Sequence, residues 1–328
     1  MKQVAIHYVD PKRYDAVYID WTLGNFCNFK CSYCPDYLHN GSNPMSDIET
    51  AKTFVKKLFN HYKLNVSKKY FVFNFFGGEP TLWKSLGEFV QWIHEYSQEL
   101  GVSSIIEILT NGSRTIRWWG EYVKYFDIVK ITHHTEFADP QHTLEVADLI
   151  VSNGKIANVQ LTMIPALWNS CIEHLNIISK SKHQFQIDVK PLRIDFGSKL
   201  YDYSPEQLEI FKQPYRKSSN MPHVENVGMG SKFLLSNNTE VAIRYQDLIT
   251  KKENSWVGWK CWAGVDIISI KQDGSIQIGG ACAVVQPGLS NKLITDADIV
   301  FPAAPVICNQ EWCSCGPDME TRKEYVKQ

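Results

Sequence analysis

The sequence predicts an α/β protein in which a parallel sheet is covered by helices on its outer side. Between residues 16 and 217, six short apolar segments of strand type alternate with six longer segments whose apolar residues recur at helical spacing. Neighbouring parallel strands need a long connection, which a helix supplies. The polar residues that interrupt this alternation come directly after the strand segments, at the edge where such sheets form their sites.

Composition and charge are those of an ordinary globular protein. Of the 328 residues, 44% are hydrophobic and 21% are charged, and this length is sufficient for a barrel-sized domain and a smaller one. With 34 basic and 35 acidic residues the net charge is -1, so nucleic acid and anionic lipid are not expected partners. Residues 1–10 lack the pattern of a signal peptide, and no run approaches the roughly 18 apolar residues of a membrane span. We therefore expect a cytoplasmic protein.

The first two strand and helix pairs are the most regular. Residues 17–23 predict a strand, and the helix after Pro44 begins with a capping pattern between Ser46 and Glu49. The apolar residues of this helix recur at helical spacing; they are Ala51, Phe54, Val55, Leu58, Phe59 and Tyr62. Residues 70–76 predict the second strand, and residues 82–100 predict the second helix.

The other four pairs follow in the same order. Strands are expected over residues 104–109, 127–132, 159–164 and 185–189. Helices are expected over residues 116–126, 140–153, 171–179 and 205–217, with Gly154 as the C-terminal stop of the second of these.

The composition changes after about residue 220. Two β-branched segments, residues 265–270 and 276–278, flank Asp273 and Gly274, and this pattern predicts a β-hairpin with a tight turn. The sequence thus predicts an N-terminal extension (residues 1–15), a strand and helix domain (residues 16–220) and a smaller C-terminal domain (residues 221–328).

Three of the nine cysteines lie close together after the first strand. Cys27, Cys31 and Cys34 have C-x3-C-x2-C spacing. A structural zinc site uses four protein ligands, and an iron-sulfur cluster is normally held by four cysteines. Three cysteines on a four-iron cluster leave one iron without a protein ligand, where a substrate or cosubstrate can bind. Reduced core thiols or part of a zinc site are the alternatives.

Two motifs in this order resemble those of the radical S-adenosylmethionine (SAM) superfamily. Tyr33 precedes the third cysteine, and Gly77-Gly78-Glu79-Pro80 follows the second strand. The resemblance implies a partial (β/α)6 barrel, a SAM-binding 4Fe-4S cluster on the three cysteines and SAM itself. It also implies that Gly77, Gly78 and Glu79 meet the methionine part of SAM. Further positions near the cofactor are then expected at Thr110, Asn111, Thr132 and His134, with Pro165 near the adenine. Turn or helix-cap hydrogen bonding is the alternative role of the first four of these.

The resemblance also implies an activity. Radical SAM enzymes reductively cleave SAM to methionine and a 5'-deoxyadenosyl radical, which abstracts a hydrogen atom from the substrate. We therefore expect oxidation, epimerisation or bond formation on a peptide or small metabolite, with a flavodoxin- or ferredoxin-type reductant. Cys171, just beyond the fifth strand, is a candidate hydrogen-atom donor, and its alternative role is a buried small residue.

The last five cysteines predict a second metal site. Cys261 and Cys282 flank the predicted hairpin, and Cys308, Cys313 and Cys315 follow it. This arrangement resembles the twitch and SPASM extensions of radical SAM enzymes, which implies a small α+β domain with one auxiliary 4Fe-4S cluster. Four of the five thiols would then be ligands, and one of the last three would be free. A zinc-binding lobe or buried thiols are the alternatives.

Two other classes of protein fit part of the pattern. A non-catalytic iron-sulfur electron-transfer protein does not need an open iron or the Gly-Gly-Glu-Pro stretch. A zinc-stabilised interaction module does not need six strand and helix units to present it. The radical SAM interpretation accounts for both features.

Overall fold

The main sheet has the parallel core that the sequence predicts. The computed structural model describes residues 3–194, 199–212, 230–243, 245–313 and 315–326. Its larger sheet has eight strands in the order β12-β11-β2-β3-β4-β5-β6-β7. The strands from β2 to β7 pair in chain order and all in parallel. Their bounds are Ala16–Thr22, Tyr70–Phe76, Ser103–Thr110, Ile128–His133, Ile156–Met163 and Gln186–Pro191. The prediction of an α/β fold is confirmed.

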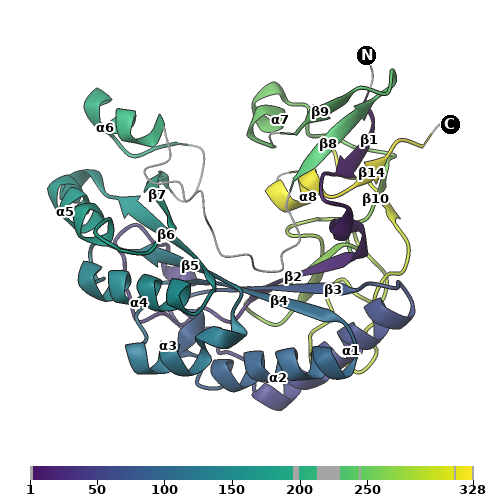
Figure 1. Ribbon diagram of the computed structural model, residues 1–328. Helices are drawn as coiled ribbons and strands as arrows, with labels where there is room; N and C mark the ends of the chain where they lie inside the picture. The colour runs from purple at the N-terminus through teal and green to yellow at the C-terminus, as the bar shows by residue number, and fades with distance from the viewer. Residues whose placement is uncertain (1–2, 195–198, 213–229, 244, 314, 327–328) are drawn as a thin grey trace.

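Helices cover the convex side of this sheet. Figure 1 shows α1 (Ile48–Leu64), α2 (Leu86–Glu99), α3 (Ile116–Tyr122), α4 (Pro140–Ser152) and α5 (Trp168–Ile178) along one side of a curved layer. The side chain of Asp47 accepts a hydrogen bond from the backbone N–H of Thr50 over 2.9 Å and caps α1. All six apolar residues that predicted the buried face of α1 are buried. The core therefore lies between these helices and the outer face of the sheet.

Several helices are shorter than the sequence predicts. A 3-10 turn, η3 (Pro80–Leu82), precedes α2, and a second one, η4 (Val123–Tyr125), follows α3. The helix α6 (Pro205–Glu209) continues as the 3-10 turn η7 (Ile210–Lys212), and residues 213–217 of the predicted helix lie outside the described residues. Further 3-10 turns are η1 (Pro11–Asp15), η2 (Asp36–Leu38) and η5 (Pro165–Leu167).

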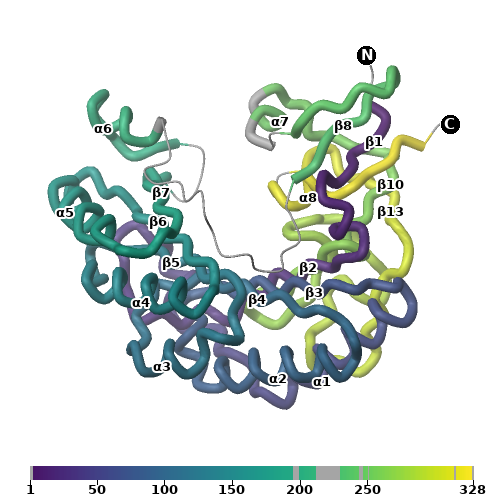
Figure 2. Tube along the Cα trace, in the orientation of Figure 1, coloured from purple at the N-terminus to yellow at the C-terminus, as the bar shows by residue number. Residues whose placement is uncertain are grey.

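The two ends of the chain share a second sheet. Its strand order is β13-β10-β14-β1-β8-β9, and its pairs are antiparallel. The bounds are β1 (Gln3–Tyr8), β8 (Ser231–Leu235), β9 (Glu240–Ala242), β10 (Lys260–Cys261), β13 (Val306–Ile307) and β14 (Lys323–Glu324). Figure 2 shows the purple β1 beside yellow and green C-terminal segments, with α7 (Tyr245–Lys251) and α8 (Gly316–Glu320) nearby. The predicted boundary at residue 220 lies outside the described residues.

The predicted hairpin forms, and it extends the main sheet. Strand β11 (Ile267–Ile270) pairs in parallel with β2, and β12 (Ile276–Ile278) pairs antiparallel with β11. Gly274, at φ +81°, takes the left-handed conformation that the turn needs. The C-terminal region thus contributes two strands to the main sheet, next to β2. The position of these strands in the sequence does not indicate this pairing.

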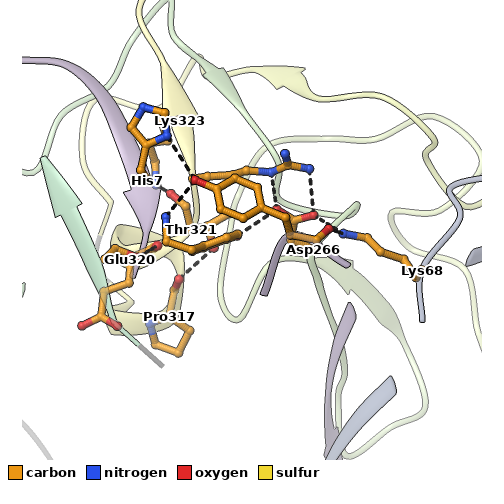
Figure 3. A network of polar contacts seen from close by, with 11 residues as sticks. His7, Lys68, Asp266, Pro317, Glu320, Thr321 and Lys323 are labelled. Carbon is orange, nitrogen blue, oxygen red and sulfur yellow. Dashed lines mark hydrogen bonds and ion pairs between the residues drawn. The ribbon is translucent and has the colours of Figure 1, made fainter. Parts of the chain in front are cut away.

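A buried carboxylate connects the two sheets. Asp266, just before β11, accepts hydrogen bonds from Lys68 Nζ (2.6 Å), Arg322 Nε (2.6 Å) and the hydroxyl of Tyr8 (2.8 Å). Figure 3 shows this network, in which Asp266 faces Lys68. The side chain of Asp266 is 1% exposed, and a charge buried to this degree requires such partners. The network fixes the second sheet to the β2 end of the main sheet.

Among the described residues, no helix is long and apolar enough to span a bilayer.

Candidate active site

The first cysteine group opens onto a large cavity at the carboxyl ends of the parallel strands. The cavity has a volume of about 940 Å³. All three thiols of the group line it, together with the last residues of β2, β3 and β4. Of the predicted cofactor residues, six line it as well: Gly77, Gly78, Thr110, Asn111, Thr132 and His134. Tyr33, Glu79, Pro80 and Pro165 are not among the lining residues.

Asn25 closes the loop that carries the cysteines. Its side-chain amide donates to Tyr37 O (2.8 Å), to Asn40 Oδ1 (2.9 Å) and to Ser42 Oγ (3.0 Å). Its side-chain oxygen accepts from the backbone N–H of Asn43 over 2.8 Å. Asn25 is 1% exposed, so these bonds are made away from water. The two ends of the loop are therefore held together by one side chain that the sequence analysis did not identify.

The two glycines after β3 allow the backbone to approach this loop closely. A Cβ at Gly78 would lie 2.4 Å from the carbonyl oxygen of Phe26, and one at Gly77 would lie 2.6 Å from that of Gly24. The backbone N–H of Glu79 donates to the same Phe26 carbonyl over 2.8 Å. Only glycine fits at these two positions without displacing the backbone of the cysteine loop.

Glu79 lies behind the cavity wall and orients the end of β4. It is fully buried, and Oε1 accepts from the N–H and hydroxyl of Thr81 (2.9 and 2.6 Å) and from the hydroxyl of Thr110 (2.7 Å). Its Oε2 accepts from the backbone N–H of Asn111 over 2.6 Å. Burial raises the pKa of this carboxyl, whereas the four donors lower it. Glu79 therefore positions Thr110 and Asn111, which do line the cavity.

The end of β4 in turn contacts the cysteine loop. The side-chain amide of Asn111 donates to Asn28 Oδ1 over 3.0 Å and to the sulfur of Cys27 over 3.9 Å. Asn28 also donates to the hydroxyl of Ser113 over 3.1 Å. A chain of hydrogen bonds thus runs from Glu79 through Asn111 to the first cysteine.

The end of β5 holds the other side of the loop. The hydroxyl of Tyr33 lies 2.6 Å from Nδ1 of His134, and the two rings stack with centroids 6.0 Å apart. Glu136 accepts from both the backbone N–H (2.8 Å) and the hydroxyl (2.6 Å) of Ser32. Burial lowers the pKa of His134 to about 4, so its imidazole is neutral at physiological pH.

The three thiols of the first cysteine group are protonated unless a cation compensates their charge. Burial raises the pKa of Cys27 and Cys34, and it raises the pKa of Cys31 to about 12. Such thiols deprotonate only when a cation compensates the charge, as bound metal does. Within the described part of the chain, no group of three or more His, Cys, Asp or Glu side chains could hold one metal ion. Thiolates are the ligands of iron-sulfur clusters, and three thiols line this cavity.

Four of the five C-terminal cysteines line a second, smaller cavity. Its volume is about 70 Å³, and the thiols that line it are Cys261, Cys282, Cys308 and Cys313. Cys315 is not among them, and its sulfur lies 2.8 Å from where a Cβ at Gly280 would be. Four cysteines are the usual ligand set of a 4Fe-4S cluster. Cys315 thus lies outside the group of four cysteines that line the second cavity.

Asp318 and Lys323 organise this second cavity. The carboxylate of Asp318 accepts from the backbone N–H groups of Gly280 and Ala281, each over 2.8 Å, and so fixes the segment before Cys282. The ammonium of Lys323, a residue that is 2% exposed, lies 4.7 Å from the ring centroid of Trp256 and donates to Thr321 O over 2.9 Å. Burial raises the pKa of Cys282 and Cys313 to about 12, while the nearby Lys323 lowers that of Cys313. Sequence reasoning missed both organising residues.

Cys171 lies in the core and not at the cavity. It is fully buried on α5, and its sulfur accepts from the backbone N–H of Ile164 over 3.3 Å. It also lies 3.5 Å from the hydroxyl of Thr135. This position matches the alternative role, that of a buried small residue. The role of hydrogen-atom donor stays a prediction, and the burial of the thiol does not favour it.

The hairpin turn is the unexpected part of the cavity wall. Lys271, Gln272 and Asp273 connect β11 to β12 and line the same cavity as the first three cysteines. Lys271 Nζ donates to the carbonyl of Gly280 over 3.3 Å, two residues before Cys282. The turn was readable from the sequence, but its place became evident only from the pairing of β11 with β2.

Comparison with known proteins gives matches in structure alone. No protein-family model matches the chain, and no curated protein matches its sequence. The fold is similar to that of anSMEcpe, an anaerobic sulfatase-maturating radical SAM enzyme, with bound AdoMet. The TM-score is 0.50 and the identity 17%, over 86% of this chain and 79% of that chain. Two further structures of anSMEcpe are similar, one with AdoMet and the Cp18Cys peptide and one of the hexahistidine-tagged protein with AdoMet. Each has a TM-score of 0.50 and 16% sequence identity, over 87% of this chain and 79% of that chain. At this level of identity the likeness shows a shared fold.

Proposed function

We propose that this chain is a radical SAM enzyme whose active site is the 940 Å³ cavity. Cys27, Cys31 and Cys34 would hold the 4Fe-4S cluster. The observation that carries the proposal is that three thiols and the ends of four parallel strands line one cavity. When bound, the cluster and SAM supply the reductive cleavage that yields a 5'-deoxyadenosyl radical for removal of a hydrogen atom from the substrate.

The residues of the chain would bind and orient SAM in this cavity. Gly77 and Gly78 bring bare backbone to the wall, where a side chain would take up space. Thr132 and the neutral His134 offer hydrogen-bonding groups from the end of β5. Glu79 acts indirectly, because it holds the backbone of Asn111 in place. Orientation by such fixed groups is what the protein contributes to cofactor chemistry.

We infer an auxiliary 4Fe-4S cluster at the second cavity. Cys261, Cys282, Cys308 and Cys313 would be its ligands, and Cys315 would remain a free thiol. The ammonium of Lys323 near these thiols would compensate part of the negative charge of a cluster bound by four thiolates. The region from residue 221 to residue 328 would then be a twitch or SPASM type of domain.

The proposed substrate is a peptide, and the proposed electron donor is a flavodoxin- or ferredoxin-type protein. A peptide is supported by the structure of anSMEcpe with bound Cp18Cys peptide. All nine cysteines are free thiols, which fits a reducing compartment such as the cytoplasm. Oxidation, epimerisation and bond formation are all compatible with this site.

The test is SAM turnover by the anaerobically reconstituted protein. We expect 5'-deoxyadenosine to form from SAM with dithionite as the reductant, and we expect none from a variant with Cys27→Ala, Cys31→Ala and Cys34→Ala. A variant with Cys171→Ala serves as the thiol control and should still cleave SAM. Absence of 5'-deoxyadenosine from the wild-type protein, with its iron in place, would refute the proposal.

A further inference from the structure

A row of polar side chains crosses the inner face of the main sheet. The row follows the strand register directly from Ser269 (β11) to Asp20 (β2), Asn74 (β3) and Glu107 (β4). On β5 the row moves toward the carboxyl end, because Lys130 pairs with Leu109, two residues after Glu107. From Lys130 (β5) it follows the register directly to Asn158 (β6) and Gln186 (β7). We call these seven residues the inner polar row.

The opposite face of the same strands is apolar. The neighbours of Asp20 in β2 are Ile19 and Trp21, and those of Asn74 in β3 are Phe73 and Phe75; all four pack in the core with the helices. Side chains alternate between the two faces of a strand, so the row points away from the helices. Placing polar side chains there costs free energy unless they find partners.

The row lies directly beneath the proposed SAM cavity. Thr22, Phe76, Leu109 and Thr132 line the cavity, and each stands two residues after a member of the row. Residues two apart in a strand point to the same face and are about 6.6 Å apart. The row is therefore the next layer of side chains below the cavity wall.

Most members of the row satisfy one another. Asn74 Nδ2 donates to Asp20 Oδ1 over 3.1 Å, and Lys130 Nζ pairs with Glu107 Oε2 over 2.7 Å. The ion pair leaves Asp20 as the remaining charge of the row. With two carboxylates against one ammonium, the seven residues carry a formal charge of -1.

Two polar atoms of the row lack a partner within the described part of the chain. Ser269 is 3% exposed, and its buried hydroxyl makes no hydrogen bond. The side-chain oxygen of Asn158 is also buried without a partner. Asp20 accepts a hydrogen bond from Asn74, and among the described residues no ion pair joins it to a cation, whereas Glu107 has Lys130. Buried polar atoms without partners are rare in native proteins and indicate a missing partner.

We propose that the inner polar row binds an amine-bearing group of the substrate, with Asp20 as the partner of its ammonium. The hydroxyl of Ser269, cross-strand from Asp20, would accept a second N–H of the same ammonium. An anionic group would meet the uncompensated carboxylate instead, so it would be excluded. The proposal rests on the function proposed above, since it assigns the substrate group that lies under the SAM cavity.

The test is anaerobic titration calorimetry on the reconstituted protein with SAM bound. The probes are N-acetyl-lysine amide and its norleucine and glutamate analogues, which differ in the charged end of the side chain. We expect the lysine probe to bind about tenfold more tightly than the norleucine probe, the scale of one charge-assisted hydrogen bond. The glutamate probe should bind more weakly than both.

Variants connect the preference to the row. Asp20→Asn should lower the affinity for the lysine probe to that for the norleucine probe, and Ser269→Ala should lower it in part. The affinity of Asp20→Asn for the norleucine probe should stay unchanged, which shows that the sheet is intact. Glu145→Gln, at an exposed position on α4, is the charge control and should change nothing. Equal binding of the lysine and norleucine probes, or an unchanged preference in Asp20→Asn, would overturn the proposal.

The outcome separates this proposal from the proposed function. Binding is measured without SAM cleavage, and SAM cleavage is measured without the probes. A protein that prefers the lysine probe but never forms 5'-deoxyadenosine keeps the amine site and loses the radical SAM activity. A protein that cleaves SAM but has no preference among the probes loses only the amine site.

Discussion

The hydroxyl of Tyr33 and Nδ1 of His134 share a hydrogen bond of 2.6 Å, which ties the cysteine loop to the end of β5. Burial lowers the pKa of His134 from its usual value of 6.5 to about 4, so the imidazole of the folded protein is neutral near pH 7. The arrangement of the loop is therefore connected to the protonation of one histidine.

Acid should weaken the fold through this histidine. Between about pH 6.5 and about pH 4 the unfolded chain protonates His134 and the folded chain does not, so the free energy of unfolding falls as the pH falls. One such group contributes up to about 1.4 kcal/mol per pH unit. Urea unfolding of the cluster-free protein at about pH 7 and about pH 5 should show the loss. His134→Gln keeps a hydrogen-bonding partner for Tyr33 and should make this loss of stability smaller. An identical pH dependence in the variant would contradict this assignment.

Glu79 should be required for the shape of the site although it does not line the cavity. Glu79→Gln replaces one carboxylate oxygen by an amide donor, which leaves a buried donor, such as the N–H of Asn111, without its acceptor. The expected cost is about 1–3 kcal/mol in the free energy of unfolding, together with weaker SAM binding in equilibrium dialysis. Glu95→Gln, on the exposed face of α2, is the matched control. Wild-type stability and SAM affinity in Glu79→Gln would show that its four hydrogen bonds are dispensable.

The close approach of the segment after β3 to the cysteine loop can be tested with two glycine-to-alanine variants, one at the contact and one away from it. Gly78→Ala would place a Cβ 2.4 Å from a backbone oxygen, so the loop has to move and iron retention should fall. Gly120→Ala on α3 meets no atom within 4 Å and should keep all iron and raise stability by about 0.5–1 kcal/mol, as alanine does in a helix. Iron analysis after gel filtration distinguishes them, and full iron content in Gly78→Ala would contradict the packing argument.

The two neighbouring cysteines near the C-terminus should differ. Cys313→Ala removes a thiol that lines the second cavity, so about four irons per chain should be lost if the auxiliary cluster no longer assembles. Cys315→Ala removes the thiol that lies beside Gly280 and should leave the iron content unchanged. The reverse result would exchange the roles of the two residues.

Much of the fold could be predicted because local pattern and burial agree. The buried face of α1 follows from helical spacing alone, and Gly274 follows from the chemistry of the hairpin turn. The glycine pair was readable as a motif because the close approach of two backbones demands glycine. The cysteine loop was readable from the spacing of its three thiols.

The remaining parts depend on contacts that are distant in the sequence. In the sequence, Asn25 looks like an ordinary turn residue. Only the folded loop brings three acceptors to its side-chain amide, so its role could not be predicted. The position of Lys271 in the cavity wall requires β11 to pair with β2 across more than two hundred residues. The central polar residue of each strand, such as Asn74 among phenylalanines, was the signal that could have revealed the inner polar row.

The most direct test of the central claim is electron paramagnetic resonance of the dithionite-reduced protein, with and without SAM. A variant with Cys261→Ala, Cys282→Ala, Cys308→Ala and Cys313→Ala isolates the first cluster. If SAM binds the open iron of a cluster held by Cys27, Cys31 and Cys34, the g values of the reduced cluster will shift when SAM is added. A reduced cluster whose spectrum is identical with and without saturating SAM would contradict the account.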